Sequence, residues 1–309
     1  MNKNSCCALL LLLLAPLQSM QAQSDTTLIR SHFRQILQTP GFRHHANPAA
    51  LNQVADYVHA TFRRHTERVE RQVYQVDGQS YQNVICSFGP QEAPRLIIGA
   101  HYDVCGEQAG ADDNASGTVG LLELARLLQG QSLPFRIDLV AYTLEEPPHF
   151  RSEDMGSHVH AKSLVDQKVL VLGMLSLEML GYFKDEKKTQ DYPVAPLKLF
   201  YGSRGNYITL VRKPGNGSFP RRFTRLYKKN ALVRTKSIAA PAFIPGIDFS
   251  DHLNYWKYNM PALMLTDTAF LRNKNYHEKT DTLETLDLPR MALALDGVLK
   301  TVLALAAEK

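Results

Sequence analysis

The sequence predicts an α/β protein with a single domain, built on a mixed, mostly parallel central sheet with helices on both faces. Three observations support this fold class. Strand-like and helix-like segments alternate along most of the chain, as in folds whose strands are connected by helices. The strand-like segments are nearly continuous apolar runs, which indicates burial on both faces of a sheet. An early strand pair around the turn sequence DGQS (residues 77–80) predicts a hairpin, and therefore antiparallel strands at one edge.

The first segment of the chain is typical of a secretory signal peptide. Lys3 precedes an apolar run from Cys6 to Leu17, which is too short to span a bilayer comfortably, and small and polar residues follow. We expect cleavage near Ala22, so that residues 1–22 are the signal peptide and residues 23–309 form the mature domain. A retained membrane anchor is the alternative. The remaining chain has no second long apolar segment, so we expect an exported protein, periplasmic or secreted, without stable membrane insertion.

The elements of the mature chain can be placed in order. The region from about Thr26 to Thr66 is expected to be helical, and one helix in it begins with Asn47 as a cap and Pro48 at its first position. We expect strands over residues 68–76, 82–88, 95–103, 135–146, 168–180 and 260–267. We expect further helices over residues 115–129, 156–165 and 287–308.

Charge is unevenly distributed along the chain. The net charge is +5, but residues 198–236 contain eleven Lys and Arg residues and no Asp or Glu. A solvated basic face is the simpler interpretation, and a surface that attracts acidic substrates or an anionic envelope is the alternative. The interleaved aromatic residues do not form a recognisable nucleic-acid module, so we expect no nucleic-acid partner. The sequence predicts no particular oligomeric state.

Two cysteines, Cys86 and Cys105, would remain after cleavage of the signal peptide. Two cysteines in a chain of this length are too few for a disulfide scaffold, and they could be free or paired with each other. The chain has no CxxC pair, so its sequence does not predict a zinc site built from thiolates.

Acidic residues and histidines follow four of the predicted buried strands at the same end. They are His101 and Asp103 in the first, Glu145 and Glu146 in the second, Glu178 in the third, and His277 shortly after the fourth. Asp113 lies in a glycine-containing loop that leads into a helix. Proteins with sheets of this type bind their ligands at the carboxyl ends of the strands, so we expect these side chains to form one site.

The chemistry of this residue set favours a divalent metal. Carboxylates that converge in one cleft repel each other unless a cation neutralises them. Two imidazoles with carboxylates and without thiolates fit a zinc-like ion better than calcium or an iron–sulfur cluster. Two metal ions bridged by one carboxylate are a known solution for hydrolysis.

These motifs, taken together, resemble the M28 family of zinc aminopeptidases, which also includes related carboxypeptidases. The motifs are HYD, GADDNASG followed by LLELARLL, the pair EE, an acidic residue after a later apolar strand, and YHEKTDT. They occur in the order of the family and, with their leading strand, extend from Leu96 to Thr282. The combination is specific, although no single motif is.

The resemblance implies a role for each residue of the site. Two zinc ions are expected, with His101 and Glu178 on the first, Glu146 and His277 on the second, and Asp113 bridging both. Glu145 would be the general base for a metal-activated water. Asp103 would orient His101, and Asp251 is expected to support the site without binding metal. A strained or cis peptide bond is expected after Asp113.

Two departures from the family pattern affect these expectations. Glu178 stands where the family often has Asp, which changes the reach of that ligand. Ile247 stands where some members have a Tyr that helps to stabilise the oxyanion. The donor is therefore missing or comes from elsewhere, with Tyr182 and Tyr255 as candidates.

The function expected from the resemblance is that of an exported, zinc-dependent exopeptidase, most simply an aminopeptidase, whose partners are peptide substrates. Three alternatives remain open. The first is a glutaminyl-cyclase-like acyltransferase with one zinc ion, and the second is a carboxypeptidase or dipeptidase of the same fold. The third is a binding protein of this fold that holds no metal.

Overall fold

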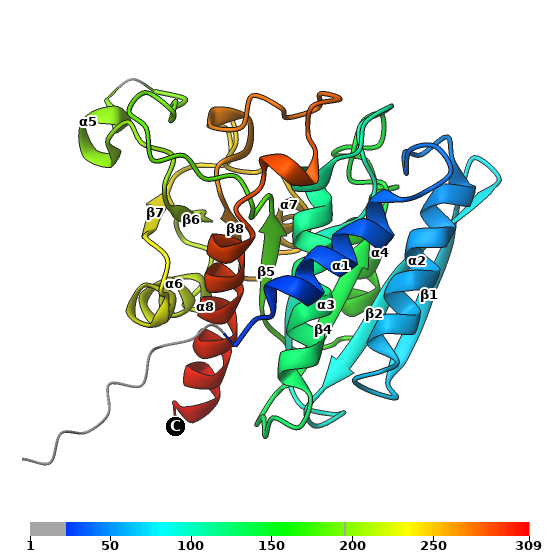
Figure 1. The fold of residues 1–309 in the computed structure, drawn as a ribbon. Coiled ribbons are helices and arrows are strands. Elements are labelled where there is room, and N and C mark those ends of the chain that lie inside the picture. Colours follow the sequence, from blue (N-terminus) through cyan, green and yellow to red (C-terminus); the bar gives the residue numbers. More distant parts are fainter. Residues whose placement is uncertain (1–22, 195, 309) are drawn as a thin grey trace, which may run out of the picture.

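An eight-stranded sheet forms the centre of the molecule, with the strand order β1-β2-β4-β3-β5-β8-β6-β7 (Figure 1). The computed structural model describes residues 23–194 and 196–308, so the expected signal peptide lies outside the described residues. The strands are β1 (Val69–Val76), β2 (Gln79–Phe88), β3 (Arg95–His101), β4 (Arg136–Tyr142), β5 (Val171–Glu178), β6 (Ile208–Arg212), β7 (Thr235–Ala239) and β8 (Ala262–Thr266).

The four neighbouring strands β4, β3, β5 and β8 run parallel to one another. β1 and β2 form the predicted hairpin, and β2 pairs antiparallel with β4. On the other side, β6 is antiparallel to β8 and parallel to β7. The prediction of a mixed, mostly parallel sheet is confirmed, because the four continuous apolar runs are its central strands.

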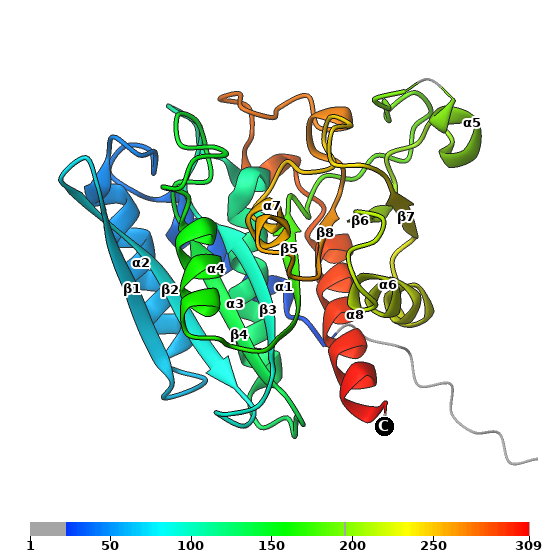
Figure 2. The ribbon, with the colours of Figure 1, turned by 180° about the vertical axis from the view of Figure 1, so that it is seen from behind.

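Helices cover both faces of the sheet, as predicted. They are α1 (Thr26–Leu37), α2 (Pro48–Phe62), α3 (Gly117–Leu128), α4 (Gly156–Asp166), α5 (Leu197–Tyr201), α6 (Phe219–Asn230), α7 (His252–Lys257) and α8 (Leu288–Ala307). One face packs against α1, α2, α3, α6 and α8, and the opposite face packs against α4 and α7 (Figures 1 and 2). Among the helices of the described residues, none is long and apolar enough to cross a membrane.

Local sequence signals explain several helix boundaries. The Asn47 side chain accepts a hydrogen bond from the backbone N–H of Ala50, which is the predicted cap of α2. Asp287 caps α8 in the same way through the N–H of Arg290. The expected helical region from Thr26 to Thr66 contains two helices, α1 and α2, with a bent segment that includes Pro40 and Gly41 between them.

The segment between residues 181 and 259 contains elements that the sequence did not predict, namely β6, β7, α5, α6 and α7. The two strands have five residues each, and the helix α6 lies in the basic stretch. The aromatic side chains of Phe223 and Tyr227 on α6 are buried against the core, whereas Arg222 and Arg225 pair with Glu308 at the surface. This arrangement fits a basic face on an amphipathic helix.

Candidate metal centre

The carboxyl ends of the four parallel strands bring the predicted residues to one edge of the sheet. His101 is the last residue of β3 and Glu178 is the last residue of β5. Glu145 and Glu146 follow the end of β4, and His277 lies in the loop after β8. Because β4, β3, β5 and β8 are adjacent and parallel, their ends lie next to one another.

His101 is at the centre of the first group of side chains. Its Nε2 atom lies 3.5 Å from Oδ1 of Asp113 and 3.5 Å from Oε2 of Glu178. The same nitrogen is 3.8 Å from Oε2 of Glu145. All four side chains are buried. Ligand atoms of His101, Asp113 and Glu178 are therefore close enough together to hold one metal ion.

His277 belongs to a second group, which shares Asp113 with the first. The His277 Nε2 atom lies 3.2 Å from Oδ2 of Asp113 and 3.1 Å from Oε2 of Glu146. Asp113 thus presents Oδ1 to His101 and Oδ2 to His277. This is the arrangement that a bridging carboxylate requires.

The loop that carries Asp113 is fixed by partners from distant parts of the chain. The backbone turns over Ala111–Ser116 and leaves helical geometry at Asp113 and Asn114, and the Asp113–Asn114 peptide bond is cis, as the family resemblance implied. The Asn114 amide donates hydrogen bonds to the carbonyl of Leu177 and to Oε2 of Glu178, at 2.9 and 3.3 Å. The turn is therefore connected to the end of β5.

Asp281 also holds this loop, and the sequence analysis did not single it out. Its carboxylate accepts hydrogen bonds from the backbone N–H groups of Asp112 and Asp113, both at 3.0 Å. The side chain of Asp112 turns away from the site, where it accepts from Gly181 and Asn273. Asp281 is part of the YHEKTDT motif, so its position just after His277 was the signal that could have identified it.

Asp103 lies behind His101. Its Oδ1 atom is 3.5 Å from Nδ1 of His101, on the side of the ring opposite the metal-facing Nε2. Its two carboxylate oxygens accept the backbone N–H groups of Glu145 and Glu146, at 3.2 and 3.1 Å. This single buried carboxylate contacts both the strand end β3 and the segment that follows β4.

In the part of the chain that the structure describes, the Asp251 carboxylate makes no hydrogen bond to a predicted ligand. Asp251 is fully buried, and neither carboxylate oxygen has a hydrogen-bond partner among the described residues. Its neighbour Ser250 donates a hydrogen bond of 2.7 Å to Oε2 of Glu178. Ser250 is therefore the residue of this segment that contacts the site, and the sequence analysis missed it.

The charges of the site favour a bound cation. Burial and the charge of Asp113 raise the pKa of Glu146 to about 7. Burial alone would lower the pKa of His277, but its interactions with Asp113 and Glu146 raise it to about 10. The charge of Asp113 contributes to both shifts, because it disfavours a second negative charge on Glu146 and favours a positive charge on His277.

Unsatisfied atoms in the site fit a metal as well. Within the described residues, Oδ2 of Asp113, Oε1 of Glu146 and Nε2 of His277 have no hydrogen-bond partner that meets geometric criteria. Buried polar atoms without partners are rare in proteins and call for a missing ligand such as an ion. The residues present are therefore suited to hold the metal that this set of nitrogen and oxygen donors prefers.

The predicted donors for an oxyanion are not both available. The Tyr255 hydroxyl is buried and bonded to Tyr142 and to His160, at 2.6 and 2.7 Å, so it is occupied elsewhere. For the second candidate, Tyr182, the Lys184 ammonium lies over the face of the ring, 5.0 Å from the ring centroid. A third tyrosine, Tyr276, was not considered from the sequence.

Tyr276 lies directly beside the site. Its ring stacks on the imidazole of His277 with a centroid distance of 3.8 Å and an angle of 18° between the planes. Burial raises the pKa of the Tyr276 phenol, and the charges of Asp113 and Glu146 raise it further. The phenol therefore stays protonated near these carboxylates and is able to donate a hydrogen bond.

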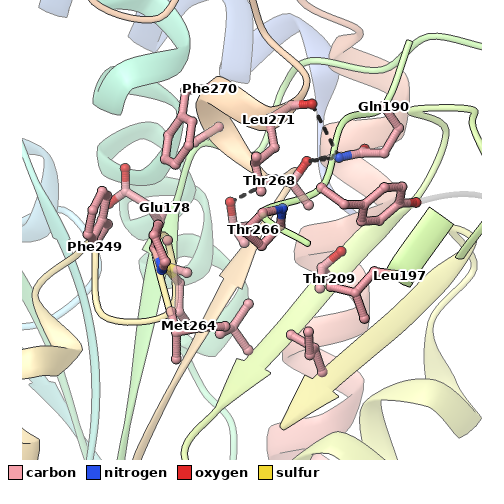
Figure 3. Close-up of a pocket in the computed structure, with 18 of the residues that line it drawn as sticks. Glu178, Gln190, Leu197, Thr209, Phe249, Met264, Thr266, Thr268, Phe270 and Leu271 are labelled. Carbon is pink, nitrogen blue, oxygen red and sulfur yellow. Dashed lines mark hydrogen bonds between the residues drawn. The ribbon is translucent and has the colours of Figure 1, made fainter. Parts of the chain in front are cut away.

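A largely apolar pocket opens beside Glu178 (Figure 3). It extends from the end of β5 between β6, β8 and the loop after β8. Aromatic and aliphatic side chains form most of its wall, including Phe249, Phe270, Met264 and Leu197. A pocket of this kind next to converging polar groups is suited to bind an apolar side chain.

The sequence is similar to proteins of known families. The sequence model of the family described as "Peptidase family M28" matches residues 83–302. An Escherichia coli protein named "Uncharacterized protein YfbL" is 42% identical over 274 residues, which are 86% of this chain and 84% of that protein. A probable leucine aminopeptidase of Trichophyton verrucosum is 26% identical, over 71% of this chain and 56% of the fungal protein. The chain spans about half the length of the leucine aminopeptidases that it matches.

Solved structures of similar shape come from two kinds of enzyme. The LapA aminopeptidase of Legionella pneumophila has a TM-score of 0.72 at 18% identity and covers 92% of this chain and 72% of its own. The glutaminyl cyclase of Porphyromonas gingivalis has a TM-score of 0.66 at 17% identity and covers 91% of this chain and 99% of its own. At these identities the similarity establishes the fold and does not choose between the two reactions.

Proposed function

Because the chain belongs to peptidase family M28, we propose that it is an exported, zinc-dependent aminopeptidase that removes apolar residues from the N-termini of peptides. The observation that supports this proposal most directly is the position of Asp113, whose two oxygens face the imidazoles of His101 and His277. A carboxylate placed between two imidazoles suits a pair of metal ions, and paired ions are a common solution for peptide hydrolysis.

The metal ligands in this proposal are the five side chains expected from the family resemblance. His101 and Glu178 would hold one zinc ion, Glu146 and His277 would hold the other, and Asp113 would be shared between them. Bound zinc would supply polarisation of the scissile carbonyl and a lower pKa for a bound water. Asp103 keeps the ligands in position, because it contacts His101 and the backbone of Glu145 and Glu146.

Glu145 is the general base in this proposal. Its carboxylate lies 3.8 Å from Nε2 of His101, and burial raises its pKa well above the ordinary value for glutamate. A carboxylate next to the ligands is within reach of an attacking water. Glu145 would take a proton from that water and return it to the leaving amine.

Tyr276 is proposed as the donor to the oxyanion, in place of the residue that Ile247 replaces. Its protonated phenol lies beside His277, where a substrate carbonyl near the second metal position would be. Donors that are oriented before the reaction stabilise developing negative charge without reorganisation.

The pocket beside Glu178 supports an apolar substrate side chain. Its walls come mainly from aromatic and aliphatic residues, which are suited to contact an apolar side chain. We therefore propose that it receives the side chain of the N-terminal residue, such as Leu, Phe or Tyr.

A screen of fluorogenic amino-acid amides on purified, zinc-loaded protein tests the proposal. Release of apolar residues, with about two zinc ions per chain, is the expected result. Activity only on N-terminal glutamine, with one zinc ion and formation of pyroglutamate, would instead identify an acyltransferase. Release of C-terminal residues would identify a carboxypeptidase, and failure to bind zinc would identify a metal-free binding protein.

A further inference from the structure

Cys105 lies in the loop between β3 and the Asp113 turn, next to the second group of the metal centre. We propose that its thiol is an additional ligand of the metal ion that Glu146 and His277 would hold. This inference rests on the metal centre proposed above, and it adds a sulfur donor that neither the motifs nor the family resemblance assign.

The positions of the donor atoms support the proposal. The sulfur of Cys105, a carboxylate oxygen of Glu146 and a ring nitrogen of His277 all lie within 4.8 Å of one another. In a tetrahedral zinc site, sulfur, nitrogen and oxygen ligands are separated by roughly 3.5 Å, which follows from zinc–ligand distances near 2.0–2.3 Å. The three donors would therefore close around an ion with a movement of about 1 Å, which a side-chain rotation supplies.

A second observation, independent of the cysteine, points to a ligand at this place. The Glu146 side chain is only 4% exposed, and its Oε1 atom has no hydrogen-bond partner among the described residues. The Nε2 atom of His277 lies 3.1 Å from the other carboxylate oxygen of Glu146, without the geometry of a hydrogen bond. Both residues belong to the group with Cys105, so an ion held by this group would satisfy the unpaired Oε1 atom.

The backbone around Cys105 is held against the His277 loop. In the amide orientation that satisfies its neighbours, the buried side chain of Gln108 donates to the carbonyl of His277 at 2.9 Å and to that of Cys105 at 3.2 Å. One amide group thus connects the two segments that carry the sulfur and the imidazole. The backbone that carries the thiol is therefore held beside the backbone that carries the imidazole.

Disulfide formation does not compete for this thiol. Cys86 and Cys105 are both free in the described structure, and Cys86 is buried in β2 with no exposed surface. Cys105 is partly exposed, so a metal ion can reach it from solvent. On coordination the thiol loses its proton to solvent and binds as a thiolate.

A sulfur ligand would make the two metal positions chemically different. The position at His101 and Glu178 offers only nitrogen and oxygen, whereas the position at Glu146 and His277 would add a soft thiolate. Thiolates favour zinc over magnesium, manganese and calcium, which prefer oxygen. We therefore infer that the second position selects zinc more strongly than the first.

Cobalt substitution provides a direct test, because Co²⁺ bound to a thiolate has a sulfur-to-metal charge-transfer band in the near ultraviolet. The metal-free protein, Cys105→Ser and Cys105→Ala would be titrated with Co²⁺, with Cys86→Ala as the matched control. The band is expected in the unmodified protein and in Cys86→Ala, and is expected to be lost in both Cys105 variants. Identical near-ultraviolet spectra in all four proteins would overturn the proposal.

Zinc binding gives a second readout that does not depend on activity. Calorimetry is expected to show at least a tenfold loss of zinc affinity at one of two sites in the Cys105 variants. Zinc is also expected to protect Cys105 from alkylation by iodoacetamide, as located by mass spectrometry. Alkylation at the same rate with and without bound zinc would contradict the inference. Absence of Co²⁺ and zinc binding in the unmodified protein would instead remove the metal centre of the proposed function.

Discussion

Asp281 accepts a hydrogen bond of 3.0 Å from the backbone N–H of Asp113, across 168 residues of sequence. The same carboxylate accepts the N–H of Asp112, so it fixes two consecutive peptide groups of the turn. The side chain of Asp113 can face two imidazoles only if its backbone is held in this orientation. Asp281 is therefore a positioning residue for the bridging carboxylate.

The variant Asp281→Asn tests this relationship. Asparagine has a single acceptor oxygen and no charge, so the hydrogen bonds that hold the two backbone N–H groups become fewer and weaker. We expect zinc affinity to fall by about 10–100-fold. Zinc titration by calorimetry measures the effect, with Asp191→Asn, an exposed aspartate paired with Lys274, as the control. Equal zinc affinity in the two variants would contradict the positioning role.

The variant Glu145→Gln separates catalysis from metal binding. The amide cannot accept a proton from water, so kcat is expected to fall by about 10²–10⁴-fold. Zinc content should stay near that of the unmodified protein, because Glu145 is proposed as a base and not as a ligand. Elemental analysis and amide hydrolysis on the same sample measure both quantities. Full activity would disprove the assignment of the base.

The variant Tyr276→Phe tests the proposed donor to the oxyanion. Phenylalanine keeps the stacking on His277 and removes only the hydroxyl group. We expect kcat to fall by about 10²-fold with little change in KM, because the hydrogen bond would form mainly in the transition state. If KM rises and kcat is unchanged, Tyr276 contributes to substrate binding instead.

The variant Thr209→Phe tests the assignment of the apolar pocket. Thr209 lines this pocket on β6, and its hydroxyl has no hydrogen-bond partner among the described residues. A larger ring should fill the space, so kcat/KM for leucine and phenylalanine amides is expected to fall by about 10–100-fold. The alanine amide serves as an internal control, since its side chain does not need the deep part of the pocket. An equal loss for all three substrates would indicate a general disturbance of the site.

Buried His160 makes stability depend on pH. Burial lowers its pKa to about 4 from 6.5, while the charge of Asp138 opposes this shift and the charges of Arg95 and Arg136 add to it. Between pH 4 and 6.5 the unfolded chain therefore binds a proton that the folded protein does not. The stabilisation that comes from keeping His160 neutral is fully present above pH 6.5 and is lost as the pH falls toward 4.

A buried histidine of this kind changes the free energy of unfolding by up to about 1.4 kcal/mol per pH unit in this range. The variant His160→Gln retains a partner for the Tyr255 hydroxyl and removes the titration. Urea unfolding at several pH values between 4 and 7 is expected to show a slope smaller by about one proton than in the unmodified protein. An unchanged slope would show that His160 is not the origin of this dependence.

Much of the fold was accessible from the sequence because its signals are local. The continuous apolar runs identified the four central strands, and Asn47 with Pro48 identified the start of α2. The strands β6 and β7 were missed because they have five residues each and lie beside or within a basic stretch. Such short strands depend on pairing with β8 and with each other more than on their own composition.

The sequence by itself determined which residues gather at the carboxyl edge of the sheet, because each follows a buried strand or enters a helix in a recognisable motif. Only the tertiary structure decided that one carboxylate, Asp113, faces both histidines, and that Asp281, Ser250 and Tyr276 surround the site. It also decided that Cys105 lies beside Glu146. These contacts join segments far apart in the chain, and their distances depend on strand order and loop conformation, which local periodicity does not encode.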